Sequence, residues 1–316
     1  MPIDDSQSIV NTIKTYIRDK KDTQMVVVIL SSKRKDRYDA VKRICCLEFP
    51  VPSQVVTSAI IDDVRKRRSV VTKVAIQMNC KLGGELWTTM IPMKNVMICG
   101  IDTYHDSEKK NASVCAFVAT TNENKSKYFS RATIQSTHQE LSNNLTITVK
   151  SACEFYRKIN NGQLPEKIII YRDGISDGQL KLVTDYEIPQ IQSAFKMVDV
   201  NYNPNLAFTV VKKRGNARFF AKAGGNLINP PCGTVIDNTV TRNEWFGFIN
   251  LMVIFKIMFI KKLKRYDFYL ISQVVTQGTV NPTHYNIVYD SMGLKPDIHQ
   301  KLAYKLTHMY YNWPVS

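Results

Sequence analysis

The sequence has few acidic residues for its length. Asp and Glu number 27 among 316 residues, against 43 Lys and Arg, so the formal net charge is +16. A deficit of this size excludes an acidic, self-solvating chain and favours a polyanionic partner, with a basic surface of no special function as the alternative. We therefore expect nucleic acid among the partners.

The seven cysteines include no C-x-x-C pair, and their number is odd. This excludes the simplest zinc and thiol-redox motifs and a complete disulfide framework. The opening residues, MPIDDSQSIVNTIK, also lack the apolar segment of an export signal. We therefore expect reduced thiols and an intracellular protein, cytoplasmic with the nucleus as the open alternative.

Long apolar runs are scarce, although 44% of the residues are hydrophobic. The exception is FGFINLMVIFKIMFIKKLKR, residues 246–265. Its apolar part is only about fifteen residues long and contains Asn250 and Lys256, which excludes a membrane span. The composition fits a globular chain of about two domains with no membrane partner.

Hydrophobic periodicity predicts a mixed order of helices and strands. Helices are expected over residues 6–22, 145–156 and 294–314, and over 179–198 with an interruption near Pro189. Strands are expected over 25–30, 95–102, 113–121, 168–172 and 207–211, and residues 107–112 have the polar character of a hairpin turn. This alternation is typical of an α/β fold with a mixed sheet.

The rest of the chain is organised around IIIYRDGISDGQL, which begins at Ile168. Its β-branched run predicts a strand buried on both faces, so Asp173 lies where that strand ends. Ligands gather at the carboxyl ends of strands in open α/β sheets, which makes Asp173 a candidate metal ligand. The alternative is that Asp173 only forms a turn with Gly174.

This segment resembles the Piwi domain of Argonaute proteins, and most of all the Piwi branch of that superfamily. NVMICGIDTYHD, HQELSNNL and NPTHYNIVYD resemble further segments of the same domain. The resemblance implies a ribonuclease H-like sheet and a catalytic set of Asp102, Glu140, Asp173 and His284. In that scheme Asp102, Asp173 and His284 would bind Mg²⁺ or Mn²⁺ for two-metal hydrolysis, and Glu140 would position water.

Read without the family, Glu140 is an acid favoured at the start of a helix and His284 a satisfied polar residue. The alternation of basic and aromatic residues in KKRGNARFF suits a nucleic-acid backbone. The resemblance implies an RNA channel at that segment, with Lys213, Arg214 and Arg218 as contacts.

Three earlier segments resemble the Mid domain of the same branch: SSKRKDRYDAVKRICC, PVPSQVV and QMNCKLGGELW. The resemblance implies a pocket for the 5′-phosphate of a guide RNA. Its cations would neutralise the phosphate, its amides would donate hydrogen bonds, and its aromatic ring would stack on the first base. The matching residues are Tyr38, Lys42, Gln54, Gln77 and Lys81.

The resemblance therefore implies a partial Rossmann-like Mid domain over 1–90 and a ribonuclease H-like Piwi domain with a mixed sheet over 91–316, truncated at its end. Residues 246–265 match nothing in the family, and we interpret them as translated intron, with a genuine insertion as the alternative. An exposed protrusion with paired strands on both sides, Thr239–Trp245 and Tyr266–Val275, is the expected form.

The function that the resemblance implies is that of a piRNA-guided endoribonuclease acting in germline silencing of transposons or genes. Its partners would be a 5′-phosphorylated guide RNA, a complementary target RNA and protein cofactors of the silencing pathway. Two alternatives stay open: a guide-dependent scaffold that does not cleave, and an inactive fragment.

Overall fold

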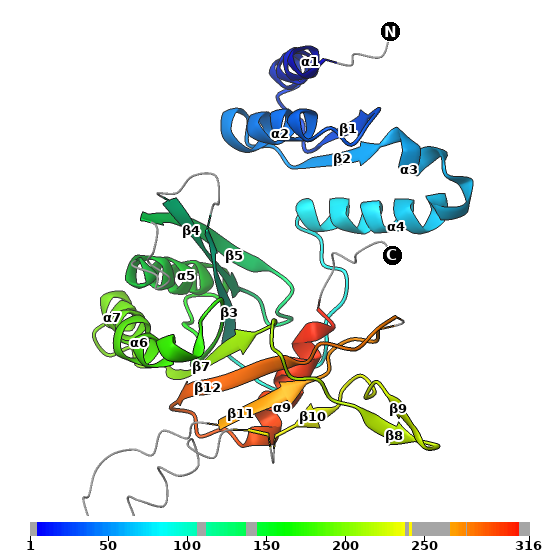
Figure 1. The fold of residues 1–316 in the computed structure, drawn as a ribbon. Coiled ribbons are helices and arrows are strands. Elements are labelled where there is room, and N and C mark those ends of the chain that lie inside the picture. Colours follow the sequence, from blue (N-terminus) through cyan, green and yellow to red (C-terminus); the bar gives the residue numbers. More distant parts are fainter. Residues whose placement is uncertain are drawn as a thin grey trace, which may run out of the picture. The chain divides into compact units, whose positions relative to one another are not determined.

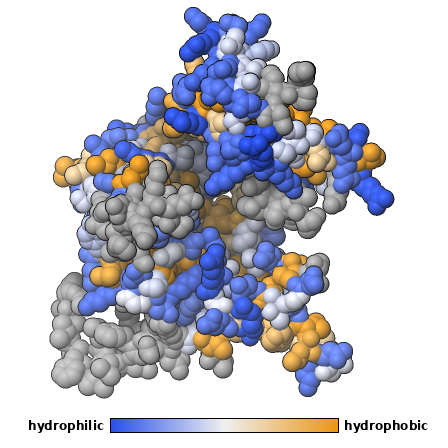
Figure 2. All heavy atoms as spheres, turned by 45° about the horizontal axis from the view of Figure 1, so that its top comes forward, coloured by the Kyte–Doolittle hydropathy of each residue, from blue (hydrophilic) through white to orange (hydrophobic). Residues whose placement is uncertain are grey.

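The computed structural model describes residues 5–105, 112–136, 144–237, 240–241, 266–275 and 277–309 (Figure 1). The chain divides into two compact units, one containing the described residues up to Trp87 and the other running from Thr88 to Met309. Hydrophilic residues cover much of the face drawn in Figure 2, in keeping with the high charge.

The first unit is built on a short parallel pair of strands, β1 and β2. Ile13 and Ile17 of the first helix pack against Val41, Ile44 and Cys45, which form the centre of its core. The elements are α1 (Ser6–Asp19), β1 (Val26–Leu30), α2 (Lys35–Arg43), the π-helix η1 (Ile44–Glu48), β2 (Ser53–Thr57), α3 (Ser58–Asp62) and α4 (Val64–Lys81).

The second unit contains an eight-stranded sheet in the order β10-β11-β12-β7-β6-β3-β4-β5. Its central strands β3, β6 and β7 are parallel, and the outer pairings are antiparallel, so the sheet is mixed as predicted. The strands are β3 (Val96–His105), β4 (Ala112–Thr120), β5 (Tyr128–Ser136), β6 (Lys167–Asp173), β7 (Asn205–Lys212), β10 (Val235–Ile236), β11 (Tyr266–Leu270) and β12 (Thr283–Asp290). A separate hairpin joins β8 (Ala221–Ala223) to β9 (Asn226–Ile228).

Helices cover both faces of this sheet. α5 (Leu145–Ile159) and α7 (Ile188–Val198) supply one core, together with the alternate residues Ile168 and Ile170 of β6. α9 (Pro296–Thr307) packs through Leu302 against the opposite face, which carries Ile169. The continuous apolar run of β6 is explained by this double coverage, because a strand buried on both faces has no polar side.

The irregularity expected near Pro189 lies just ahead of that residue. The chain passes through η2 (Asp177–Gln179), α6 (Leu180–Leu182) and the π-helix η3 (Val183–Glu187), and α7 then runs without interruption through Pro189. Proline lacks an N–H and is tolerated in the first turn of a helix, so the wider π-turn ahead of it accommodates the missing bond.

β11 ends at Leu270, five residues before the expected end at Val275. Residues 246–265 and most of Thr239–Trp245 lie outside the described residues, and residues 240 and 241, which are described, are not in a strand. Residues 107–111 of the turn expected over 107–112 also lie outside the described residues, while Ala112 begins β4. The strands that flank this turn, β3 and β4, pair antiparallel as a hairpin requires. Across the described ranges, no helix has both the length and the apolar character needed to cross a membrane.

Candidate catalytic edge and phosphate pocket

Asp173 is the last residue of β6, whereas β3 continues past its expected end at Asp102 to His105, so Asp102 lies within β3 at the point where the pairing with β6 ends. β3 and β6 run parallel, and Ile101 is paired with Arg172, which places each aspartate one position beyond a paired residue. β7 lies on the other side of β6, with Asp173 paired to Val211. Because parallel strands end at one edge of the sheet, both carboxylates belong to the same edge.

The turn that follows Asp173 approaches Asp102 closely. Gly174 has φ +83°, a conformation that only glycine adopts without strain, and its N–H donates to Oδ1 of Asp173 at 2.9 Å. A Cβ at this position would lie 3.7 Å from Oδ1 of Asp102. The positive φ of the turn therefore accounts for the glycine, since a Cβ would make only an ordinary van der Waals contact with Asp102.

Lys213 supplies a cation to this edge. Its ammonium nitrogen lies 2.5 Å from Oδ2 of Asp173, whose side chain is 25% exposed. The preceding residue, Lys212, pairs with Asp177 in the loop after β6. Lys213 thus pairs with the last residue of β6, and Lys212 pairs with a carboxylate in the loop that follows it.

A fully buried ion pair, Arg172 with Glu187, lies next to the end of β6. Arg172 and Glu187 are both inaccessible to solvent, and Nε and Nη2 of the arginine each lie 3.2 Å from Oε1 of the glutamate. Nη1 of Arg172 donates to the backbone carbonyl of Asp173 at 2.6 Å. Glu187 is the last residue of the π-helix η3, so this irregular turn positions the carboxylate.

His284 lies near the beginning of β12, which pairs antiparallel with β7 through His284 and Lys212. This places it at the same edge of the sheet as Asp102 and Asp173. Its Nε2 is 2.7 Å from Oδ2 of Asp267, and its ring stacks on Tyr269 with centroids 4.1 Å apart. The imidazole is therefore held by neighbours on β11.

The structure brings three of the four predicted catalytic residues to one edge, but not into one cluster. Among the described residues, no group of three His, Cys, Asp or Glu side chains is arranged to hold a metal ion. Glu140 lies outside the described residues. The metal roles of Asp102, Asp173 and His284 therefore stay predictions.

The five residues predicted for a terminal phosphate form one connected network in the first unit. Two lysine ammonium groups meet at the backbone carbonyl of Ser53, Lys42 at 3.1 Å and Lys81 at 2.7 Å. Lys81 also donates to Oε1 of Gln54 at 2.7 Å, and Gln54 donates to Gln77 at 3.3 Å.

Tyr38 completes this network, because the Lys42 ammonium lies 5.6 Å from the centre of its ring. Both lysines reach Ser53 from different helices, Lys42 from α2 and Lys81 from the end of α4. Burial lowers the pKa of Lys81 below its ordinary value, and the like charge of Lys42 adds to this. Among the described residues, these two ammonium groups contact a carbonyl, a hydroxyl and an amide oxygen, and neither pairs with a carboxylate.

A cavity of about 470 Å³ opens beside the network. Tyr38, Gln54 and Gln77 line it, and its other walls include several apolar residues of β2 and α4. Four further basic residues contribute to its lining: Lys33, Arg34, Lys35 and Lys73. A flat ring, amides and cations around a hollow of this size suit a nucleotide with a terminal phosphate.

The three residues predicted to contact the RNA backbone have different surroundings in the structure. Lys213 binds Asp173, while the guanidinium of Arg218 donates to the carbonyls of Gly215 at 2.8 Å and Ala217 at 2.7 Å. Arg214 and Arg218 are exposed. Their role in binding RNA stays a prediction.

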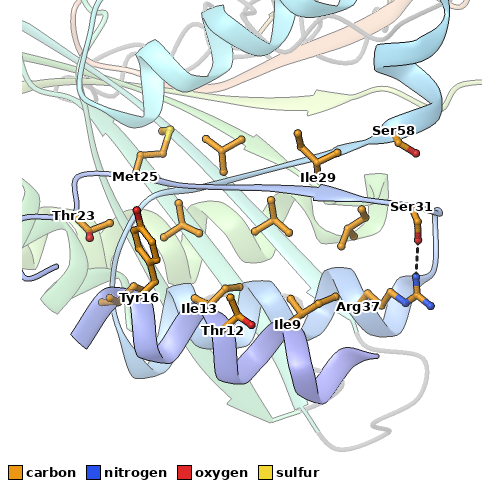
Figure 3. Close-up of a pocket in the computed structure, with 15 residues that line it drawn as sticks. Ile9, Thr12, Ile13, Tyr16, Thr23, Met25, Ile29, Ser31, Arg37 and Ser58 are labelled. Atoms are coloured by element: carbon orange, nitrogen blue, oxygen red, sulfur yellow. Dashed lines mark hydrogen bonds between the residues drawn. The ribbon is translucent and has the colours of Figure 1, made fainter. Parts of the chain in front are cut away.

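A second cavity of the first unit, about 850 Å³, lies between α1 and β1 and is mostly apolar. Figure 3 shows Ile9, Ile13 and Tyr16 on the side of α1 that faces the strand. Arg37 lies at one end and donates to Oγ of Ser31 at 3.0 Å. The cavity contains none of the predicted site residues, and its apolar lining does not suit a phosphate.

Comparison with known proteins identifies the family. The Piwi domain matches residues 25–316. The chain belongs to the Piwi domain family. It is 48% identical to Piwi-like protein 1 of Danio rerio over 93% of this chain and 32% of that protein. It is 46% identical to Piwi-like protein Ago3 of Bombyx mori, over 92% of this chain and 29% of that protein.

Solved structures give the same result. The chain superposes on the crystal structure of Drosophila Piwi with a TM-score of 0.83 and 33% identity, covering 99% of this chain and 39% of the other. Kluyveromyces polysporus Argonaute, solved with a guide RNA, gives a TM-score of 0.78 at 21% identity over 92% of this chain and 35% of the other, which shows the fold alone. The mixed sheet is thus that of the ribonuclease H-like Piwi domain. This chain spans about a third of the length of the curated Piwi relatives.

Sequence reasoning missed several residues that hold these sites. The carbonyl of Ser53 accepts hydrogen bonds from both lysines of the phosphate network, but a serine at the start of a strand carries no signal of such a role. Glu187 and Asp267 could have been found as acidic residues within predicted buried elements, since such residues need a partner. Their partners, Arg172 and His284, are 15 and 17 positions away.

Proposed function

We propose that this chain is the guide-binding and catalytic part of a small-RNA-guided silencing protein that cleaves its target RNA. The observation that carries the proposal is the placement of Asp102 and Asp173 on the adjacent parallel strands β3 and β6 of a Piwi-family sheet, each one position beyond their last paired residues. Hydrolysis of a phosphodiester needs carboxylates from different segments held close together. That sheet edge provides two of them.

The phosphate network is proposed to hold the 5′ end of the guide. Lys42 and Lys81 converge on one carbonyl and would exchange part of that contact for a phosphate, which carries more negative charge. Tyr38 would stack on the first base, and Gln54 and Gln77 would orient the phosphate through their amides. Kluyveromyces polysporus Argonaute, which has the same fold, was solved with a guide RNA.

The residues at the sheet edge fit a hard divalent cation in part. Asp102 and Asp173 offer the oxygen donors that Mg²⁺ and Mn²⁺ prefer, and Asp173 already holds a cation, the ammonium of Lys213. His284 would add a nitrogen donor. When bound, divalent ions supply an activated water and stabilise charge on the leaving oxygen.

The protein's own residues would fix the geometry of that reaction. Arg172 anchors the carbonyl of Asp173 and so fixes the direction from which its carboxylate projects. Guide and target would select the sequence by base pairing, while the basic residues Lys213, Arg214 and Arg218 contact the backbone. Glu140 is proposed to position water.

A second candidate is a guide-dependent scaffold that binds target RNA without cleaving it. The observation that favours it is that two proposed metal ligands are engaged elsewhere, Asp173 with Lys213 and His284 with Asp267. Both candidates share the guide pocket, so only a cleavage assay separates them.

The deciding experiment joins this chain to the remaining domains of Piwi-like protein 1 of Danio rerio and loads it with a 5′-phosphorylated guide. Cleavage of a matched RNA that disappears in Asp173→Ala, with guide binding retained, supports the endonuclease. Asp185→Ala, which changes an exposed acid of the same unit, is the control and should cleave normally. Guide-dependent target binding without cleavage in the unsubstituted protein favours the scaffold.

The guide pocket has a separate test on the chain itself. Lys81→Ala should weaken binding of 5′-phosphorylated RNA by about 10- to 100-fold, because a charge-assisted contact is lost, and should leave 5′-hydroxyl RNA nearly unchanged. Lys20→Ala, at the exposed end of α1, is the matched control. Equal losses for both RNAs would show that no phosphate pocket exists.

A further inference from the structure

Asp267 is a buried carboxylate with one partner, His284. It is 1% exposed and lies on β11 directly opposite Asn286, two positions from His284 on β12. Its Oδ2 is 2.7 Å from Nε2 of His284, which is itself 9% exposed. The contact is short and shielded from water, so it is far stronger than a surface pair.

The ring of His284 is also fixed in its plane. Tyr269, the residue paired with His284 across the two strands, stacks on it with an interplanar angle of 6° and centroids 4.1 Å apart. Phe219 meets the Tyr269 ring edge-on at 5.2 Å. Stacking fixes the ring plane and the carboxylate fixes its rotation within that plane, so the imidazole has one orientation.

The fold alone does not account for this carboxylate. Oδ1 of Asp267 is buried, and no described residue forms a hydrogen bond with it. A carboxylate removed from water with half of its acceptor capacity unused destabilises a protein, and an apolar residue would pack here at lower cost. Its contact with Nε2 instead fixes the orientation and the protonation site of the His284 imidazole.

That contact selects the tautomer. An ionised carboxylate accepts hydrogen bonds and cannot donate them, so the proton of a neutral His284 resides on Nε2. Nδ1 then keeps its lone pair, and no described residue occupies it. An imidazole whose second nitrogen is held by a carboxylate is the arrangement that orients histidine ligands of metals.

We propose that Asp267 is a positioning residue that holds His284 in the Nε2-protonated form and leaves Nδ1 as the donor atom at the catalytic edge. The use of that atom rests on the proposed endonuclease function, but the tautomer does not. Asp267 touches no reacting group and acts only through His284.

The chain contains its own control. His299 of α9 makes the same type of contact, with Nε2 3.3 Å from Oδ2 of Asp290, and is buried on the other face of the sheet. Asp290 also accepts backbone N–H groups from Met292, Gly293 and Leu294, so it has a structural role of its own. Changing one aspartate should affect only its own histidine.

The test is nuclear magnetic resonance of the ¹⁵N-labelled chain at mildly alkaline pH, with the ring ¹⁵N shifts reporting the protonation of each nitrogen. The chain has five histidines, so a His284→Gln variant identifies the signals. We expect a one-bond N–H signal from Nε2 of His284 that exchanges slowly with water. In Asp267→Ala the exchange of this proton with water should accelerate by roughly 10- to 100-fold, because one hydrogen bond to a charged group is lost.

Asp267→Asn retains an acceptor oxygen and should show intermediate exchange, which keeps the test available if the alanine variant does not fold. Asp290→Asn should change only the His299 signals. A proton on Nδ1 of His284, or unchanged exchange in the Asp267 variants, would overturn the proposal.

Mn²⁺ alone then separates this inference from the proposed function. Line broadening of His284 by Mn²⁺ that is lost in Asp102→Ala and weakened in Asp267→Ala supports both. An Asp267-dependent tautomer without any Mn²⁺ broadening of His284 keeps the positioning role and removes His284 from the metal site.

Discussion

The ammonium of Lys213 lies 2.5 Å from Oδ2 of Asp173, so the carboxylate proposed to bind a divalent ion already has a cation beside it. The lysine is 65% exposed and directly follows β7, which ends at Lys212. An exposed pair of this kind contributes little to stability, which makes Lys213 a competitor for the ion and not a structural element.

Lys213→Ala should therefore lower the Mg²⁺ concentration needed for half-maximal cleavage. The expected change is about two- to fivefold, the equivalent of the 0.5–1 kcal/mol that an exposed ion pair contributes. The measurement is cleavage against Mg²⁺ concentration in the chimera with a full set of domains. Lys213→Arg keeps the charge and should behave as the unsubstituted protein. A higher Mg²⁺ requirement in Lys213→Ala would show that the lysine assists the site.

The buried pair of Arg172 and Glu187 leads to a prediction about stability. Glu187→Ala removes the carboxylate that contacts Nε and Nη2 of Arg172, a guanidinium at 0% exposure, which should cost about 3–5 kcal/mol in the free energy of unfolding. Urea denaturation of the chain, followed through the signal of the second unit, measures it.

The control for this prediction is the double variant Arg172→Met with Glu187→Leu. Removing both charges together should restore most of the lost stability, because no charge is then buried without a partner. If the double variant is as unstable as the single one, the loss comes from packing around η3 and not from the unpaired charge.

Much of the second unit follows from local sequence. The run Ile168–Ile170 predicts a doubly covered strand, and β6 is buried on both faces by α7 and α9. The edge that collects Asp102 and Asp173 follows from strand polarity once β3 and β6 are known to be parallel neighbours. The family resemblance, confirmed by the comparisons, supplied the rest of the fold.

The contacts of the site could not be predicted in the same way. In the sequence, Lys213 is one of several consecutive basic residues. No local pattern predicts that its ammonium contacts Asp173 on the neighbouring strand. The contact between Asp267 and His284 depends on the register in which β11 pairs with β12. Register is set by three-dimensional packing, so sequence patterns give the strands and not their partners.

The cysteines should differ sharply in reactivity. Burial raises the pKa of Cys153 to about 12 and that of Cys99 well above its usual range, whereas Cys46 is exposed. Since the thiolate is the nucleophile, iodoacetamide at neutral pH should modify Cys46 and spare the other two. Peptide mass spectrometry after a short exposure measures this. Early labelling of Cys153 would mean that α5 does not pack as described.

The last prediction concerns the pH dependence of the phosphate pocket. Burial, reinforced by the charge of Lys42, lowers the pKa of Lys81. A base with a lowered pKa loses its proton at a lower pH than an ordinary lysine does. The contribution of Lys81 to phosphate binding is therefore complete below that lowered pKa and is lost as the pH rises through it.

The quantity to measure is the ratio of dissociation constants for 5′-hydroxyl and 5′-phosphorylated RNA from neutral to alkaline pH. The terminal phosphate is almost fully ionised once the pH is about two units above its second pKa of about 6, so a change in the ratio at higher pH reports on the protein. The ratio should fall at a pH below the ordinary titration of lysine. Lys81→Arg stays charged at every pH used and should keep a flat ratio over the same range. A ratio that falls equally in both proteins would assign the loss to Lys42 or to RNA, and would show that Lys81 does not carry the recognition of the phosphate.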